Sequence, residues 1–234
     1  MTPSEIFSFK TLHEQLGHKP HDNRSIVEQM KSSRSLFCQS LVSNGYLSQQ
    51  QMLHAVDRYR LGITREGGVV FWQIDQQQVL RDGKVMYYGP DCHRDHDHHP
   101  SWASARLKQQ GLLPESFSPR HCLFGLHLLE VDRHPVVAVV ESEKTAVIMS
   151  ELLPSHLWMA CGGLTMLTAA MLQPLHDCKV ILFPDTDVDG KSYRLWCDVA
   201  EASGQPIYVS DLLERSATPD QKARKIDIAD LLFP

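Results

Sequence analysis

Residues 179–190 read KVILFPDTDVDG, an apolar run that ends in three aspartates and a glycine. A continuous apolar run is typical of a strand that is covered on both faces of a parallel sheet. On extended backbone, side chains two residues apart point the same way, so Asp185 and Asp187 project together while Thr186 points away. The stretch therefore predicts a buried strand with paired carboxylates at its carboxyl end.

A second strand of the same kind lies upstream, where residues 134–141 read HPVVAVVE and end at Glu141. With the strand at 179–184, two more strands are predicted at 157–160 and 206–210. Helices are predicted at 143–153, 164–175, 191–204 and 225–233. Strands that alternate with helices at this spacing predict a parallel sheet with right-handed crossovers. Sites in such sheets form at the carboxyl ends of the strands, so Glu141 and the two aspartates are expected to share one crevice if their strands are neighbours.

The first half of the chain has a different pattern. Residues 1–23 are polar and are expected to be irregular or partly helical, residues 24–43 approximate a helical face, and Ser48 is positioned to cap another helix. Short β-branched and aromatic runs at 69–75, 77–82 and 84–89 predict a small antiparallel sheet, with a hairpin turn at Asp82-Gly83. A turn is predicted at 132–135. We therefore divide the chain into an N-terminal α+β subdomain, 1–130, and an α/β domain, 131–234.

Charge is distributed unevenly between these parts. Residues 1–130 hold 14 Lys and Arg against 13 Asp and Glu, whereas residues 131–234 hold 9 against 15. Clustered carboxylates repel a phosphate backbone unless cations neutralise them, so the acidic half is better suited to a metal site than to a bare nucleic-acid groove. Apolar runs are too short for a membrane span and the N-terminus lacks a signal core, which predicts a cytoplasmic protein with no membrane partner. The six scattered cysteines are expected to be reduced thiols.

The acidic residues at the strand ends predict a divalent cation site. Mg²⁺ prefers carboxylate oxygens and keeps waters that a phosphate can displace, so Glu141, Asp185 and Asp187 are the expected ligands and catalytic groups, with Asp189 as a further acidic ligand. The alternative is that Asp187 or Asp189 only caps the following helix.

Two motifs here resemble those of the toprim family. Residues 136–146, VVAVVESEKTA, look like the first toprim motif, and residues 183–190, FPDTDVDG, look like the second. Within that family the likeness is greatest to the catalytic core of bacterial and phage DNA primases and their mobile-element relatives, without the zinc-binding module. Further segments share the likeness: YRLGIT (59–64), VVFWQID (69–75), GKVMYYGPDCHR (83–94), CLFGLHLL (122–129), ACGGLTMLT (160–168) and KIDIADLL (225–232).

The resemblance implies a toprim-like parallel sheet flanked by helices, and Mg²⁺- or Mn²⁺-dependent nucleotidyl transfer on a nucleic-acid template during mobile-element DNA replication. Implied partners are single-stranded DNA or RNA, nucleotides, and a replicative helicase or another replication protein. The basic groups expected at template or nucleotide phosphates are Arg81, Lys84, Arg94 and Lys144. The alternatives are a toprim nuclease that cleaves phosphodiesters and a non-catalytic nucleic-acid-binding replication accessory protein.

Other features leave two interpretations open. The basic side chains near the hairpin could instead form a solvated strand face, and Lys144 could simply pair with Glu141 or Glu143. Trp72, Tyr87, Tyr88 and Trp102 could stack on bases or pack a small core. The loop 92–99, with Cys92 and four histidines, is expected to be a mobile polar loop rather than a metal site. Asp227 either approaches the acidic cluster or caps the last helix.

Overall fold

The computed structural model describes Leu16, residues 26–131 and residues 136–233, so the predictions for 1–23 and for the turn at 132–135 lie largely or wholly outside the described residues. The chain forms two compact units, Met1–Cys122 and Leu123–Pro234. The predicted division was at 130/131. Residues 123–131 belong to the second unit, where Phe124 and Ala160 exchange backbone hydrogen bonds of 2.8 and 3.1 Å. In the described part of the chain, no helix combines the length and apolar character that a bilayer crossing requires.

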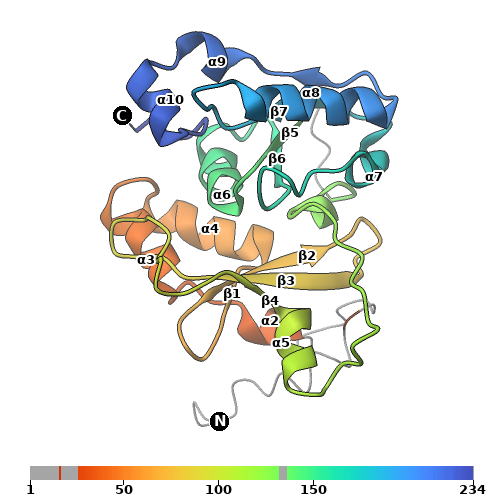
Figure 1. Ribbon diagram of the computed structural model, residues 1–234. Coiled ribbons are helices and arrows are strands. Elements are labelled where there is room, and N and C mark those ends of the chain that lie inside the picture. The colour runs from red at the N-terminus through yellow and green to blue at the C-terminus, as the bar shows by residue number, and fades with distance from the viewer. Residues whose placement is uncertain (1–15, 17–25, 132–135, 234) are drawn as a thin grey trace. The chain divides into compact units, whose positions relative to one another are not determined.

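The first unit contains a four-stranded antiparallel sheet in the order β1-β2-β3-β4 (Figure 1). Its elements are α2 (Ile26–Met30), α3 (Leu36–Ser43), α4 (Gln49–Tyr59), β1 (Gly62–Ile63), β2 (Val69–Ile74), β3 (Leu80–Met86), β4 (Ser101–Trp102) and α5 (Ala103–Gln109). One sheet face packs on α2 and α5 through Val70, Trp72 and Val85. Ser48 caps α4, as predicted, and the structure adds a capping box with Gln51. The single helix expected at 24–43 is two helices, because Ser35 caps the start of α3.

The predicted hairpin turn at Asp82-Gly83 is wrong, because β3 runs straight through both residues. The chain turns earlier, where the Asp75 carboxylate accepts hydrogen bonds from the backbone N–H groups of Gln77 and Val79. Gly83 is required by packing, since a Cβ there would lie 2.7 Å from the Trp72 ring. Asp-Gly is a common turn sequence, but here both residues serve tertiary contacts within a strand.

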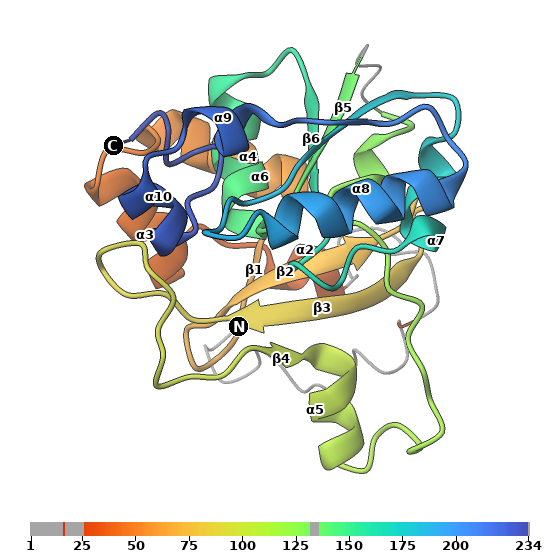
Figure 2. The same ribbon diagram turned by 45° about the horizontal axis from the view of Figure 1, so that its top comes forward.

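The second unit is built on a parallel sheet in the order β6-β5-β7-β8. Its elements are η3 (Leu126–Leu128), β5 (Val136–Val140), α6 (Glu143–Leu152), β6 (Leu157–Ala160), α7 (Ala169–Leu172), η4 (Gln173–Leu175), β7 (Lys179–Phe183), α8 (Lys191–Ser203), β8 (Tyr208–Val209), α9 (Leu212–Ser216) and α10 (Pro219–Arg224). Figure 2 shows α8 in front of the sheet and α6 behind it, as right-handed crossovers require for this strand order. The predicted α/β fold class, with a parallel sheet and a small antiparallel sheet, is confirmed.

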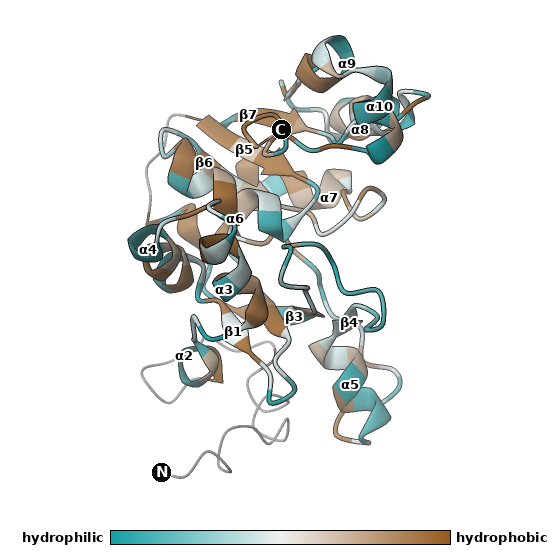
Figure 3. Cartoon of the chain, turned by 90° about the vertical axis from the view of Figure 1, so that its left-hand side faces the viewer, coloured by the Kyte–Doolittle hydropathy of each residue, from teal (hydrophilic) through white to brown (hydrophobic). Residues whose placement is uncertain are grey.

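The strands at the centre of this sheet are apolar along their length, and Figure 3 shows β5, β6 and β7 in brown. Val137–Val140 and Leu157–Ala160 are buried at every position, which is the pattern of a sheet covered on both faces. Two expected helices are reduced. Residues 164–175 are helical only in α7 and η4. Lys225 adopts a left-handed conformation that ends α10, and residues 226–233 form turns in place of a helix.

Candidate functional site

The acidic residues at the strand ends come together because β5 and β7 are neighbours. Val140 pairs with Phe183 in parallel register, so Glu141 and Asp185 emerge from the same edge of the sheet. The backbone N–H of Asp185 donates a hydrogen bond of 3.3 Å to Glu141 Oε1. The two strands are neighbours, which was the condition for a shared site, and the pairing places two carboxylates from distant parts of the sequence side by side.

Burial dominates the electrostatics of this pair. Desolvation raises the pKa of Glu141 to about 7, against the hydrogen bond from the Asp185 N–H and with the added repulsion of Asp187. Desolvation also raises the pKa of Asp185 well above its usual range, and the negative charge of Glu141 adds to the effect. Both carboxylates resist ionisation because burial outweighs the positive charge around them, and such a pair gains most from a cation.

Asp187 has a different task from its neighbours. Its Oδ1 accepts hydrogen bonds from the N–H groups of Asp189 (2.9 Å) and Lys191 (3.0 Å), and its Oδ2 accepts bonds of 2.7 Å from both the N–H and the Oγ of Ser192. Desolvation opposes ionisation here, but these four bonds outweigh it and hold the pKa of Asp187 well below its usual range. The capping alternative describes what the side chain does: it binds the first turn of α8, where the N-cap residue Gly190 has no side chain to offer.

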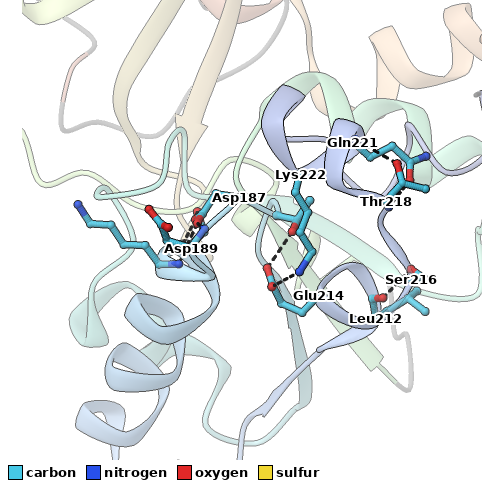
Figure 4. A network of polar contacts seen from close by, with 11 residues as sticks. Asp187, Asp189, Leu212, Glu214, Ser216, Thr218, Gln221 and Lys222 are labelled. Carbon is cyan, nitrogen blue, oxygen red and sulfur yellow. Dashed lines mark hydrogen bonds and ion pairs between the residues drawn. The ribbon is translucent and has the colours of Figure 1, made fainter.

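The turn between Asp185 and Gly190 is also anchored through Thr186, which is fully buried. Its Oγ1 donates a hydrogen bond of 2.8 Å to Glu214, and Lys222 forms an ion pair of 3.0 Å with the other oxygen of the same carboxylate. Figure 4 shows Glu214 and Lys222 joined beside the turn that carries Asp187 and Asp189. Asp189 itself is exposed. The turn is thus fixed on both sides, by α8 and by the α9–α10 segment.

A third acidic group enters this site from the end of the sheet domain. Asp227 is 7% exposed, accepts a 2.5 Å hydrogen bond from Thr145 Oγ1 of α6, and accepts bonds from the N–H groups of Ala229 and Asp230. Asp227 and Asp230 both raise the pKa of Asp185 by charge repulsion. Sequence reasoning left Asp227 between two roles and did not single out Thr145 or Asp230. Asp227 approaches the acidic pair closely enough to raise the pKa of both carboxylates, and it organises the final turn where a helix cap was expected.

Two lysines supply positive charge at this edge. Lys144, in the first turn of α6, lowers the pKa of Asp185 and of Asp227, and Lys225 lowers the pKa of Glu141. The signal for Lys225 in the sequence was its place in the KIDIADLL segment. In both cases the effect is smaller than that of burial, so the carboxylates remain short of compensation.

The carboxylates offer oxygen-only ligands, the donor type that Mg²⁺ selects. Within the residues that the structure describes, no group of three or more His, Cys, Asp or Glu side chains converges to hold a metal ion. This matters less for Mg²⁺ than for zinc, because Mg²⁺ is commonly held by one or two carboxylates, with waters and substrate phosphates completing its shell. Glu141 and Asp185 fit such a site, whereas Asp187 has its four acceptor positions filled.

The basic residues predicted at phosphates lie in the first unit, apart from Lys144. Arg81 is engaged by Asp75, which accepts a 2.7 Å hydrogen bond from its Nε. Lys84 is partly exposed on β3, and Arg94 is exposed beyond it. Arg81 therefore stabilises the β2–β3 turn, and of the three basic residues in the first unit only Arg94 is fully exposed.

The histidine-rich loop makes contacts of its own and with Tyr87 and Asn44. His98 Nδ1 lies 2.7 Å from Asp95 Oδ2, and the His98 ring stacks on Tyr87 with centroids 4.5 Å apart. Cys92 is buried and lies 3.8 Å from Asn44 Nδ2. All six cysteines fall in the described residues and are free thiols.

Comparison with known proteins places this chain among primase-like folds. A family model described as a domain of unknown function, DUF6371, matches residues 35–186. A DnaG primase catalytic domain bound to ssDNA is similar with a TM-score of 0.53 and 15% identity, over 96% of this chain and 81% of that one. A DnaG catalytic core is similar with a TM-score of 0.52 and 15% identity, over 97% and 78%. At this identity the likeness concerns the fold. No curated protein sequence matches the chain.

Proposed function

The chain belongs to the DUF6371 family, and we propose that it is a primase-like toprim protein that transfers nucleotides on a nucleic-acid template in a Mg²⁺- or Mn²⁺-dependent reaction. The observation that carries the proposal is the meeting of Glu141 and Asp185 at the carboxyl ends of adjacent parallel strands. The fold that this chain shares with DnaG catalytic domains supports it, as does the sequence resemblance of residues 136–146 and 183–190 to the toprim motifs.

In this proposal the acidic pair holds the cation. Mg²⁺ supplies positive charge that stabilises a transferring phosphoryl group and orients the attacking oxygen. Glu141 and Asp185 are the ligands, and the exposed carboxylate of Asp189 adds negative charge at the entrance. Asp187 acts as a positioning residue, because its four hydrogen bonds fix the turn in which Asp185 lies.

Positive groups would hold the phosphates. Lys144 and Lys225 lie close enough to the acidic cluster to affect its pKa values, so they can contact the same triphosphate as the cation. Lys84 and Arg94 provide charge for a template strand in the first unit. We propose single-stranded DNA or RNA and nucleotides as ligands, which accords with the ssDNA bound to one solved neighbour. Replication of a mobile element, with a replicative helicase as partner, completes the proposal.

One observation favours a second candidate, a non-catalytic protein that binds nucleic acid. The Asp187 carboxylate serves α8, so the acidic set that could hold metal is smaller than the three side chains expected from the sequence. A protein that retains the fold without turnover would bind nucleic acid in a salt-dependent way and show no product.

The experiment that tests the proposal is extension of a labelled oligonucleotide with nucleotides and Mg²⁺ or Mn²⁺. Wild-type protein should extend the primer, and Asp185→Asn should abolish the product. Asp198→Asn removes a similar charge from the exposed face of α8 and serves as the matched control. Mn²⁺ binding followed by electron paramagnetic resonance gives a second readout, in which Glu141→Gln and Asp185→Asn should each weaken binding.

The outcomes separate the candidates. Cleavage of the oligonucleotide in place of extension would assign a nuclease, the remaining alternative. Binding without either product would favour the non-catalytic protein. Undiminished activity and Mn²⁺ binding in Asp185→Asn would remove the acidic pair from the mechanism.

A further inference from the structure

A pair of aromatic rings occupies the polar part of one sheet face in the first unit. Trp102 lies in β4, and its ring centroid is 4.2 Å from that of His121. Trp102 pairs directly with Lys84 of β3 in the antiparallel register, so the two side chains project from the same face about 5 Å apart at their Cβ atoms. This is the face opposite the one that carries Val85 and packs on α2 and α5.

Trp102 differs from the other tryptophans in its exposure. All four tryptophans lie in the described residues, and Trp72, Trp158 and Trp196 are 0%, 1% and 0% exposed. Trp102 is partly exposed, as are His121 and Lys84. A partly accessible indole beside a second ring offers a flat apolar surface on which another ring can stack.

The rings are held rigidly from beneath. His121 Nδ1 lies 2.8 Å from Gln73 Oε1, which requires the imidazole to donate from that nitrogen. Gln73 in turn pairs across the sheet with Asp82, whose buried carboxylate accepts hydrogen bonds from the N–H and Oγ of Ser104. Ser104 follows Trp102 by two residues, so these contacts fix the backbone next to Trp102 as well as the His121 ring. A site fixed in advance loses less entropy when a ligand binds.

Charge around the rings is suited to a polyanion. Lys84 stands beside Trp102, and the exposed Arg120 precedes His121 in the chain. The nearest carboxylate in the network, Asp82, is fully buried and already satisfied by Ser104 and Gly83. A flat apolar ring with cations at its border matches an unpaired nucleotide, which combines a π-face with a phosphate.

We propose that Trp102 and His121 form a stacking site for an unpaired base of single-stranded nucleic acid, with Lys84 contacting the neighbouring phosphate. The inference deepens the proposed function and rests on it for the class of ligand. It assigns the binding of the strand to residues of β3, β4 and 119–122, none of which takes part in the acidic pair.

The test uses the tryptophan as its own reporter. The full chain is titrated with a short oligothymidylate in EDTA, while fluorescence quenching by acrylamide is followed. Binding should quench the accessible Trp102 emission and shield it from acrylamide. Trp102→Ala should weaken the affinity, measured by anisotropy of a labelled strand, by about 5- to 150-fold, the range found for loss of one stacked base. His121→Ala should weaken it less, and Lys84→Ala should reduce the salt slope by about 0.7.

Tyr208→Ala provides the matched control, because it removes an exposed aromatic ring from the other unit. It should bind as wild type does. Unchanged affinity in Trp102→Ala, or saturation of the strand with no change in the accessible emission, would overturn the assignment. The two proposals fail separately. If the protein does not extend a primer but the strand still quenches Trp102, only the proposed catalysis is refuted. If the protein extends a primer normally but Trp102 does not respond to the strand, only the stacking site is refuted.

Discussion

Replacing Asp187 with alanine should destabilise the second unit by about 2–3 kcal/mol. The carboxylate accepts four hydrogen bonds from the turn before α8 and from its first two residues, and two of them come from the N–H groups of Lys191 and Ser192, which have no partner within the helix. Loss of a capping side chain costs up to about 2 kcal/mol, and hydrogen bonds to a charged acceptor are worth roughly 1.5–3 kcal/mol. Exposure of the freed N–H groups to water offsets part of that loss.

Urea denaturation followed by circular dichroism measures the effect, with hydrogen exchange of α8 amides as a local probe. The midpoint should fall without a change in the m-value. Asp189→Ala is the control, because Asp189 is an exposed neighbour in the same turn, and it should change stability by less than about 0.5 kcal/mol.

The pH dependence of this difference has a defined sign. Because the folded pKa of Asp187 lies below its unfolded value, its contribution is present above about pH 4, the ordinary aspartate value, and is lost as the pH falls further. The gap between wild type and Asp187→Ala should therefore be constant from pH 5 to 8 and shrink in stronger acid. If Asp187→Ala were no less stable than Asp189→Ala at pH 7, the capping argument would fail.

Two further perturbations follow from the geometry. Glu141→Gln should stabilise the metal-free protein by on the order of 2 kcal/mol at pH 8 and by little at pH 4. The reason is that the folded pKa of Glu141 is raised to about 7, so its ionisation destabilises the fold only above the unfolded pKa of about 4.5. Urea titrations in EDTA at both pH values check this, and a difference in stability that does not depend on pH would contradict it. Gly83→Ala should lower the free energy of unfolding by about 1–3 kcal/mol, because the new Cβ would lie 2.7 Å from the Trp72 ring. Gly89→Ala, whose Cβ would meet the end of the Asp91 side chain, should lower it less in the same denaturation assay. Equal losses of stability would argue against the packing role of Gly83.

Strong apolar runs made the parallel sheet predictable. The stretches at 136–140 and 179–183 have one interpretation in an α/β frame, and each is followed by a carboxylate. The meeting of Glu141 with Asp185 depended in addition on the two strands being neighbours, which the structure shows. Spacing predicted that Asp187 projects with Asp185 but gave no sign of what it binds, because its partner Ser192 is defined only once α8 begins.

Contacts between distant residues were harder to predict. The hydrogen bond from Thr145 to Asp227 spans most of the second unit in sequence, and no local pattern signals it. In the first unit, Asp82 and Gly83 have the sequence of a turn, but Asp82 binds Ser104 and Gly83 packs against Trp72. Tertiary packing therefore overrides the local preference.

The backbone N–H of Thr186 donates a 3.1 Å hydrogen bond to the carbonyl oxygen of Ile226, so the turn after β7 is tied to a segment made much later in synthesis. Chains emerge from the ribosome N-terminus first. Strands β5 and β7 can pair while translation continues, yet the acidic edge cannot take its final form until residues 226–230 have emerged and folded back. A premature stop before Ile226 would leave a nascent protein with an intact sheet and an unfinished site.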